Sequence, residues 1–440
     1  MDARRTRTIL TLALPVIGGM VSQNVLNLVD TAMVGSLGAA ALGAVGMASF
    51  ATFMSQAFIM ALGTGVQAIA ARRLGEGRHG ELAVGLNGGL LLALLLGLPI
   101  AALMGLLAPT IFAALSDDPE VVALGVPYWN ARLFSLVAVG MNFCFRGYWN
   151  GVNRSGLYLR TLLVMHATNI LLNWILIYGK LGAPALGTLG AGIGTAASLW
   201  VGTLTYIYLG RRHAREAGFL RGLPDGATLR AMLRLSLPSG IQQLFFAAGL
   251  TALATIVGKV GTHELGAVNV LLNVTMVALL PGLGFGIVAA SLVGQALGRN
   301  DPAEARRWGW DVARVGAGAL FLLGLPMLLL PAPILRVFID DPVALAVAVT
   351  PLRISGAVIA VEGIGAVLTN ALIGAGDTRR VMLLSVGAQW LLFLPIAYLV
   401  GPLLGHGLLG VWIAYVTYRA LIALAAAALW ASGRWATIRV

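Results

Sequence analysis

An aspartate and two amides interrupt the apolar run near the start of the chain. Gln23, Asn27 and Asp30 follow spacings of four and three residues, so a helix would place them on one face. An ionisable side chain inside a membrane-spanning helix costs roughly 3 kcal/mol on insertion scales, so it usually faces a cavity or a partner. Burial also favours the neutral carboxylic acid. Asp30 is therefore predicted to face the protein interior and to exchange a proton at useful pH.

Two asparagines and a threonine could complete this site. Asn169 and Asn173 share one face of the fifth predicted helix, and Thr195 lies in the sixth. Their oxygens could coordinate a hard cation beside a carboxylate, or their polar groups could hydrogen-bond a protonated Asp30. A third interpretation is an Asp30 that is permanently hydrogen-bonded for packing. The sequence leaves these alternatives open, and it favours a satisfied polar role for His166 over proton relay.

A second acid, Glu362, lies near the middle of the tenth predicted helix. Gln242 and Gln243 on the seventh helix are its candidate neighbours. Glu362 could contact the coupling ion or the substrate, or it could be a structural carboxylate neutralised by Arg353 on the same helix. Two further arginines within apolar stretches could compensate buried acids or extend outward to the membrane surface: Arg132 and Arg419.

The elements that carry these residues must be membrane helices. Of the 440 residues, 59% are apolar and only 10% are charged, against roughly 25% charged residues in soluble domains. The mean hydropathy is +0.89. Apolar stretches long enough to span a bilayer recur along the whole chain. The sequence therefore predicts an all-α integral membrane protein of about twelve spans, near residues 9–34, 44–70, 84–107, 121–145, 157–179, 190–210, 231–257, 265–292, 312–330, 343–373, 381–400 and 408–431.

The positive charges give the predicted orientation. Of the 29 Lys and Arg residues, only Lys180, Lys259 and Arg336 lie on the loops expected outside. Most others flank the spans on the opposite side, as cytoplasmic loops do, which predicts that both termini are cytoplasmic. The net charge of +12 is explained in this way, and the chain shows no zinc-finger spacing or long basic run, so nucleic acid is not an expected partner. The single cysteine, Cys144, excludes an internal disulfide, and we expect no metal site.

The chain contains an internal repeat. Leu12-Ala13-Leu14-Pro15 returns as Leu235-Ser236-Leu237-Pro238, an offset of 223 residues. The same offset carries Val34-Gly35 onto Val257-Gly258 and Gly151 onto Gly374. A constant register over this distance indicates duplication, and an even number of spans per half predicts a pseudo-twofold axis along the membrane normal. The expected parts are an N-terminal six-helix lobe (1–210), a cytoplasmic linker (211–230) and a C-terminal six-helix lobe (231–440).

Three segments together resemble the multidrug and toxic compound extrusion (MATE) family over essentially the whole chain. They are Leu14-Pro15 followed by Val29-Asp30-Thr31-Ala32-Met33-Val34-Gly35, then Arg146-Gly147-Tyr148-Trp149-Asn150-Gly151, then Asn370-Ala371-Leu372-Ile373-Gly374-Ala375-Gly376-Asp377-Thr378. The resemblance implies two six-helix lobes and the export of drugs or metabolites by alternating access, driven by protons or sodium ions. No further cofactor is implied, and the expected partners are small-molecule substrates and the lipid bilayer.

The resemblance also assigns residues. Asp30 matches the first-helix carboxylate of the family's cation-coupling network, and Asn142, Asn169 and Asn173 resemble its amide positions, although many members carry Asp where this chain has Asn173. Glu362 matches an acid that NorM-type members use in the C-terminal lobe. Those members also have a seventh-helix Glu, where this chain has Phe246. These differences favour the DinF-like branch and proton coupling over sodium.

Two other functions compete with drug export. A lipid-linked precursor flippase of the same superfamily would need a strongly cationic central cavity, for which Arg132, Arg353 and Arg419 are the only candidates. A membrane-embedded enzyme would need paired metal-ligand motifs or a Ser-His or Cys-His arrangement in the spans, and the sequence shows none. The expected protein is a monomeric transporter in the cytoplasmic membrane of a prokaryote.

Overall fold

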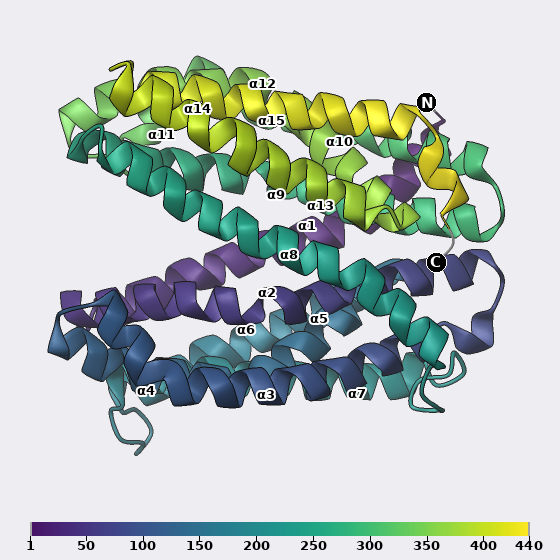
Figure 1. Cartoon of the computed structure of the whole chain (residues 1–440). Helices are drawn as coiled ribbons and strands as arrows, with labels where there is room; N and C mark the ends of the chain where they lie inside the picture. Colours follow the sequence, from purple (N-terminus) through teal and green to yellow (C-terminus); the bar gives the residue numbers. More distant parts are fainter. Residues whose placement is uncertain (1, 439–440) are drawn as a thin grey trace. The chain divides into compact units, whose positions relative to one another are not determined.

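The computed structural model describes residues 2–438, and helices account for nearly all of them (Figure 1). The first half contains α1 (Ala3–Gly35), α2 (Ala39–Gly75), α3 (Val84–Leu115), α4 (Pro119–Leu133), α5 (Leu136–Gly151), α6 (Ser155–Tyr178) and α7 (Gly187–His213). The second half contains α8 (Gly226–Gly258), α9 (Thr262–Gly298), α10 (Pro302–Leu329), the short α11 (Pro331–Leu335), α12 (Pro342–Ala375), α13 (Thr378–Gly387), α14 (Leu394–Tyr398) and α15 (Gly407–Ala431).

Each of the twelve predicted spans falls on one or two of these helices: α4 and α5 share the span at 121–145, α13 and α14 share the span at 381–400, and the short α11 belongs to none. Within the described residues, ten helical segments are long and apolar enough to cross a membrane, with Thr378–Leu403 counted as one of them. The pair α4 and α5 makes an eleventh span, bent by 48°. α7, which carries the predicted span at 190–210, is not among these apolar segments, although its 27 residues, a length of about 40 Å, exceed the roughly 30 Å hydrocarbon layer. The all-α membrane fold is therefore confirmed, and the predicted span at 121–145 corresponds to two helices with a bend between them.

Three helices begin with the same aspartate-proline pair. Asp118, Asp301 and Asp341 are the N-caps of α4, α10 and α12, and a proline follows each of them. Each aspartate side chain accepts a hydrogen bond from a backbone N–H of the first turn, and proline lacks the N–H that would otherwise stay unpaired there. These local signals fix where three of the spans start.

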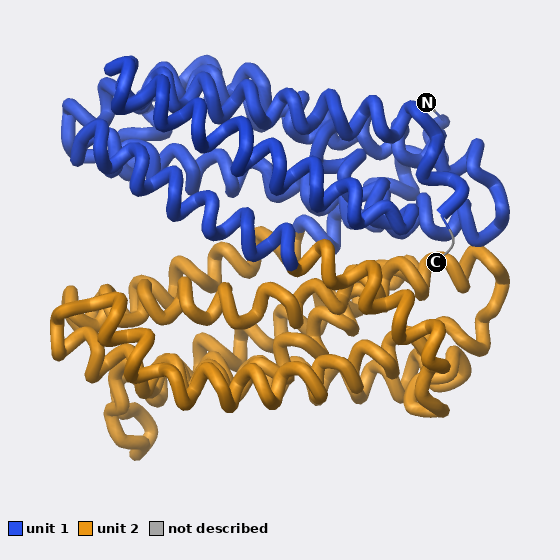
Figure 2. The backbone as a smooth tube through the Cα atoms, in the orientation of Figure 1, with its two compact units in different colours: residues 1–17, 241–440 blue, residues 18–240 orange. Residues whose placement is uncertain are grey.

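The residues of the chain group into two compact units, shown in two colours in Figure 2. Unit 1 comprises residues 1–17 and 241–440, and unit 2 comprises residues 18–240. The division cuts α1 shortly after Pro15 and α8 shortly after Pro238, so the two prolines at matching positions of the repeat lie close to the cuts. The lobe bounds at residues 210 and 231 follow the order of the repeat, and they stay a prediction.

The segment expected to link the lobes packs within unit 2. Asn87 of α3 is only 4% exposed, and its side-chain amide donates to the carbonyls of Gly218 and Gly222. Its Oδ1 accepts from the N–H of Leu220. The ring of Phe219 packs edge-on against Phe145 at 5.7 Å. These contacts hold residues 218–222 against the helices of unit 2.

Glycines mark close helix crossings in both halves of the chain. A Cβ on Gly147 would lie 2.2 Å from the carbonyl oxygen of Gly63, and a Cβ on Gly151 would lie 2.8 Å from that of Gln67, so α5 packs directly on the backbone of α2. The repeat partner of Gly151 behaves in the same way, because a Cβ on Gly374 would lie 2.3 Å from the carbonyl oxygen of Ala290 on α9. Small residues of this kind let membrane helices approach closely.

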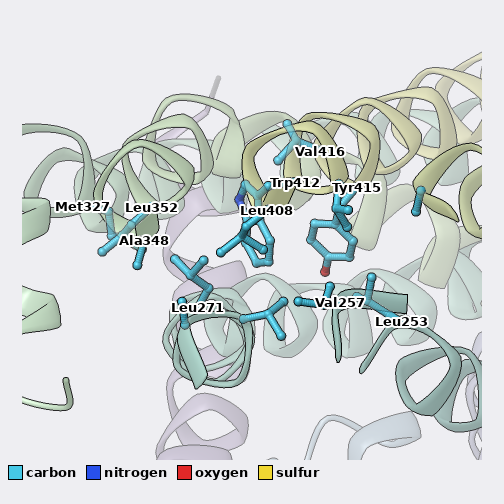
Figure 3. Packing of buried hydrophobic residues seen from close by; sticks show 14 of the residues in the cluster. Leu253, Val257, Leu271, Met327, Ala348, Leu352, Leu408, Trp412, Tyr415 and Val416 are labelled. Carbon is cyan, nitrogen blue, oxygen red and sulfur yellow. The ribbon is translucent and has the colours of Figure 1, made fainter. Parts of the chain in front are cut away.

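Unit 1 has its own apolar core. Figure 3 shows Trp412 and Tyr415 of α15 pointing toward Val257 of α8 and Leu271 of α9. Leu253, 1% exposed, belongs to the same cluster. The indole Nε1 of Trp412 donates to the Ser355 hydroxyl at 2.9 Å, so the one polar atom of this ring is satisfied.

Candidate functional site

The Asp30 carboxylate meets α6 within unit 2. Its Oδ1 accepts a hydrogen bond from Asn173 Nδ2 at 2.9 Å. Asn173 is 1% exposed, so this amide is shielded from solvent, while Asp30 is only partly buried. The predicted pairing of the first-helix acid with a fifth-span amide is therefore present in the structure.

The hydrogen bonds continue from Asn173 to α7. Asn173 Nδ2 also donates to Asn169 Oδ1 at 3.1 Å, and Asn169 Nδ2 donates to Thr195 Oγ1 at 3.1 Å. Asn169 Nδ2 also donates to Ser198 Oγ, at 3.4 Å. The structure thus brings Asp30, Asn173, Asn169 and Thr195 into one network and adds Ser198, which the sequence did not single out. This set is called the α1–α6–α7 network below.

One acceptor of this network has no partner. Asn173 Oδ1 is buried and receives no hydrogen bond from any described residue. Leaving a buried acceptor unpaired costs about 1–3 kcal/mol, so this oxygen could accept from one more donor or bind a cation. Exchange of the amide nitrogen and oxygen by rotation of the carboxamide would present Oδ1 to Asp30, where it could accept the proton of a neutral carboxyl.

A second set of polar residues lies on the earlier turns of α1. His166 of α6 bonds through Nδ1 to Ser22 Oγ at 2.7 Å and through Nε2 to Gln23 Oε1 at 3.2 Å. Gln23 Nε2 donates to Asn27 Oδ1 at 3.2 Å. The predicted face of Gln23 and Asn27 is therefore joined to α6 through His166, whose satisfied role is confirmed. Ser22 was missed because it is outside the spacing that selected the other polar residues.

Asn142 and Arg132, also singled out from the sequence, lie beside the α1–α6–α7 network. Asn142 of α5 donates to the Leu199 carbonyl at 3.0 Å and accepts from Thr203 Oγ1 at 2.9 Å. No hydrogen bond within residues 2–438 joins Asn142 to Asp30, so it fixes α5 to α7 beside the α1–α6–α7 network. Arg132 of α4 interacts electrostatically with Asp30, and its Nε atom is buried without a hydrogen-bond partner among the described residues.

Glu362 of α12 has a different environment. Arg419 Nε donates to Glu362 Oε2 at 3.1 Å, and the two side chains are 18% and 2% exposed respectively. Of the two arginines considered, Arg419 of α15 makes the ion pair with Glu362 and Arg353 does not, so Arg419 compensates a buried acid, as the sequence allowed. Gln242, a proposed neighbour, instead donates to Ser385 Oγ at 3.1 Å. Gln243 makes no side-chain hydrogen bond within the described part of the chain.

Within the part of the chain that the structure describes, the polar residues of this site have no polar network at the matching positions of the second half of the repeat. The offset of 223 residues carries Asp30 onto Leu253, which is buried in the apolar core of unit 1. It carries His166 onto Gln389, whose Nε2 donates to the carbonyl of Phe246 at 3.3 Å. No group of three or more His, Cys, Asp or Glu residues could hold a metal within residues 2–438. The carboxylate-amide network therefore belongs to unit 2.

Gly194→Ala should weaken transport because it disturbs this network. A Cβ at Gly194 of α7 would lie 2.2 Å from Asn173 Oδ1, so the carboxamide must move away from its present position. Glycine to alanine in a helix ordinarily stabilises by about 1 kcal/mol, so loss of transport with a retained fold would identify the contact with Asn173 as the cause. We expect transport to slow by a factor of about 10 to 150, since loss of one hydrogen bond to a charged group is worth about 1.5–3 kcal/mol.

The control for this variant is Gly46→Ala in α2, where a Cβ would have no atom within 4 Å. Both variants should insert into the membrane and elute from a size-exclusion column as the unmodified chain does. Only Gly194→Ala should slow transport in proteoliposomes. Equal rates for the two variants would show that the position of the Asn173 amide does not matter.

The profile of the MatE family matches residues 15–175 and 238–399. A probable multidrug resistance protein NorM from a Synechococcus species is 32% identical, over 92% of this chain and 89% of its own. A protein of the same name from Brucella suis biovar 1 is 27% identical, over 94% and 90%. The solved outward-facing conformation of a multidrug resistance MATE family transporter of the MOP superfamily superposes with a TM-score of 0.90 at 22% identity, covering 98% of this chain and 97% of that one.

Proposed function

Since the chain belongs to the MATE family, as the match of both halves to the family profile shows, we propose that it is a secondary active exporter that exchanges small organic substrates for protons. It is a multi-pass membrane protein of a transporter family and not an enzyme. The observation that carries the proposal is the hydrogen bond from the buried Asn173 amide to the Asp30 carboxylate, next to an unpaired amide oxygen.

The α1–α6–α7 network suits a proton as the coupling ion. An ionised Asp30 accepts from Asn173 Nδ2, as in the present geometry. A neutral Asp30 could donate its proton to Asn173 Oδ1 after the carboxamide has rotated, so both protonation states would have a hydrogen-bonded arrangement. The neutral acid tolerates a drier site, whereas the charged acid favours a site that holds water or a cationic substrate. Proton and substrate would therefore compete.

Sodium is the alternative coupling ion. Amide, hydroxyl and carboxylate oxygens are the ligands that hard cations prefer, and this network contains all three kinds. Asp30 is however the only acidic member of the network, and position 173 carries a neutral amide. A single carboxylate supplies less charge for binding a cation than a pair would, which favours the proton and agrees with a DinF-like branch. That branch, inferred from Phe246, remains a prediction.

The coupling ion can be identified in proteoliposomes that contain the purified chain and a fluorescent cationic substrate such as ethidium. An imposed proton gradient, with sodium absent from both sides, should drive uptake or release of the dye against its concentration gradient. A sodium gradient at equal pH on both sides should not. Transport that requires sodium at fixed pH would contradict the proposal and assign the network to cation binding.

Organic cations and amphiphilic drugs are the proposed substrates, because the relatives are named for multidrug resistance. The flippase alternative has less support: Arg419 is paired with Glu362, so it is not a free cation for pyrophosphate. We further propose a monomer in the cytoplasmic membrane of a prokaryote with both termini inside, as the distribution of Lys and Arg indicates.

A further inference from the structure

A basic pocket lies where α10 begins and α15 ends, within unit 1. Its volume is about 540 Å³, within the roughly 300–1,000 Å³ typical of ligand sites. Arg306, Arg307 and Arg314 of α10 line it together with Trp310 and Trp435. None of these residues belongs to the proposed transport site.

The pocket carries excess positive charge. Among the described residues, Asp311 is the only acid that lines it, against three arginines. Asp311 is already engaged, because its Oδ2 accepts from Arg5 Nε at 2.6 Å and its Oδ1 from Arg314 Nη1 at 3.1 Å. Since Arg5 does not line the pocket, the negative charge of Asp311 is largely satisfied from outside it. The remaining guanidinium groups therefore favour an anion.

The arginines have distinct positions. Arg306 Nη2 donates to the carbonyl of Ala431 at 2.9 Å and so ties α10 to the last turn of α15. Arg307 and Arg314 are seven residues apart, two turns along one face of the helix, and both are exposed. The Arg314 side chain is 67% exposed even while one of its nitrogens contacts Asp311. These two guanidinium groups are available to a ligand.

The partly exposed Trp310 indicates the membrane depth of this site, and the buried Trp435 forms part of its wall. Trp435 stacks on Trp430 with ring centroids 4.0 Å apart, and its Nε1 donates to the Trp430 carbonyl at 2.8 Å, which holds the segment after α15 in place. Trp310 lies between Arg307 and Arg314 on α10. Tryptophan is typical of the layer between lipid headgroups and hydrocarbon. The pocket is therefore expected at the level of the headgroups.

The surface beyond the arginines is apolar. Phe321 follows Arg314 by seven residues on the same face of α10, and it is 56% exposed. Leu322 next to it is 66% exposed. An amphiphile with a phosphate near Arg314 could therefore lay an acyl chain along these side chains, whereas a free phosphate would use none of this apolar surface.

We propose that this pocket binds the phosphate group of an anionic phospholipid through Arg307 and Arg314, with the acyl chains along Phe321 and Leu322. Guanidinium groups bind phosphate oxygens through charge-assisted hydrogen bonds, and basic pockets between membrane helices bind anionic headgroups. The lipid would connect the start of α10 with the end of α15.

The test compares lipid retention by the purified full-length chain in native mass spectrometry. Dioleoylphosphatidylglycerol should bind more tightly than dioleoylphosphatidylcholine. Each arginine in contact with the headgroup should contribute about a fivefold gain in affinity for anionic lipid, so Arg307→Gln with Arg314→Gln should lower the affinity for phosphatidylglycerol about 25-fold. Asp311 keeps its Arg5 contact in this double variant. The single Arg307→Gln, which leaves the Asp311–Arg314 pair intact, should lose about fivefold.

The matched control is Arg211→Gln with Arg212→Gln at the end of α7, which removes the same charge from unit 2 and should leave lipid retention unchanged. Equal loss in both double variants would overturn the proposal, since only net charge would then matter. Equal binding of phosphatidylglycerol and phosphatidylcholine would also overturn it. Displacement of the lipid by inorganic phosphate at the same concentration would assign the pocket to free phosphate instead.

Discussion

Asp30→Asn is expected to abolish gradient-driven export while the protein stays folded and inserted. The amide oxygen of the new side chain can still accept from Asn173 Nδ2, which now donates to Asp30 Oδ1 at 2.9 Å, so the α1–α6 contact is conserved. The amide cannot take up or release a proton, so the site is fixed in one charge state. A transporter that uses this proton should then equilibrate its substrate without concentrating it.

Drug binding should depend on pH through Asp30. If protonation of Asp30 lowers the affinity for a drug, the bound drug must lower the affinity for the proton by the same factor. Drug binding by the unmodified chain should therefore weaken as pH falls through the range where Asp30 gains its proton, and Asp30→Asn should bind drug with one affinity over that range. Fluorescence titration of the purified protein with ethidium at a series of pH values measures the drug affinity of the unmodified chain and of Asp30→Asn.

Asp117→Asn is the matched control, because it removes an exposed carboxylate just before α4 in the same unit. It should export as the unmodified chain does. If purified Asp30→Asn still pumps substrate against its concentration gradient on a proton gradient, then Asp30 is a structural residue. In that case another group must carry the proton.

The sequence was sufficient for those parts of this site that depend on local periodicity. Membrane spans are long apolar stretches, so their number and positions could be read directly. Asp30 was found because a charged residue is costly inside such a stretch. Asn169 and Asn173 were found because a spacing of four residues puts two amides on one helical face. These signals depend only on neighbours along the chain.

The remaining contacts depend on the rotation and height of one helix against another, which local periodicity does not encode. Glu362 and Arg419 are 57 residues apart, and nothing in the sequence separated Arg419 from Arg353 as the partner. Ser198 joins the network only because α7 packs beside α6 at one particular height. The α4–α5 bend is a similar case, because its two helices together still have the length and composition of one span.

Comparison of matching residues in the repeat shows that only one half holds the α1–α6–α7 network. Duplication conserved the crossing glycines, such as Gly151 and Gly374, because each makes a close helix contact in its own half. It did not conserve Asp30, whose matching residue, Leu253, is buried among apolar side chains. The packing of the helices is therefore shared by the halves, and the carboxylate-amide chemistry is not.

Removal of one member of the Glu362–Arg419 pair should destabilise the protein strongly. The Glu362 side chain is 2% exposed, so Glu362→Gln would leave the Arg419 guanidinium without its counter-charge in a largely buried site. Breaking a buried ion pair from one side costs about 3–5 kcal/mol, whereas replacing both partners with neutral groups of similar volume is often neutral. Glu362→Gln and Arg419→Met should each lower the unfolding free energy by about this amount, and the double variant should recover most of the loss.

Transport by the same three variants separates a structural role from coupling. If the pair only neutralises charge inside unit 1, the double variant should export at a rate close to that of the unmodified chain, in contrast to Asp30→Asn. Unfolding in denaturant measures the free energy of unfolding of the two single variants and the double variant. Proteoliposome assays measure their transport rates. A double variant that is stable but as inactive as Asp30→Asn would show that Glu362 is a second coupling site, because restored stability would exclude misfolding as the reason for the loss.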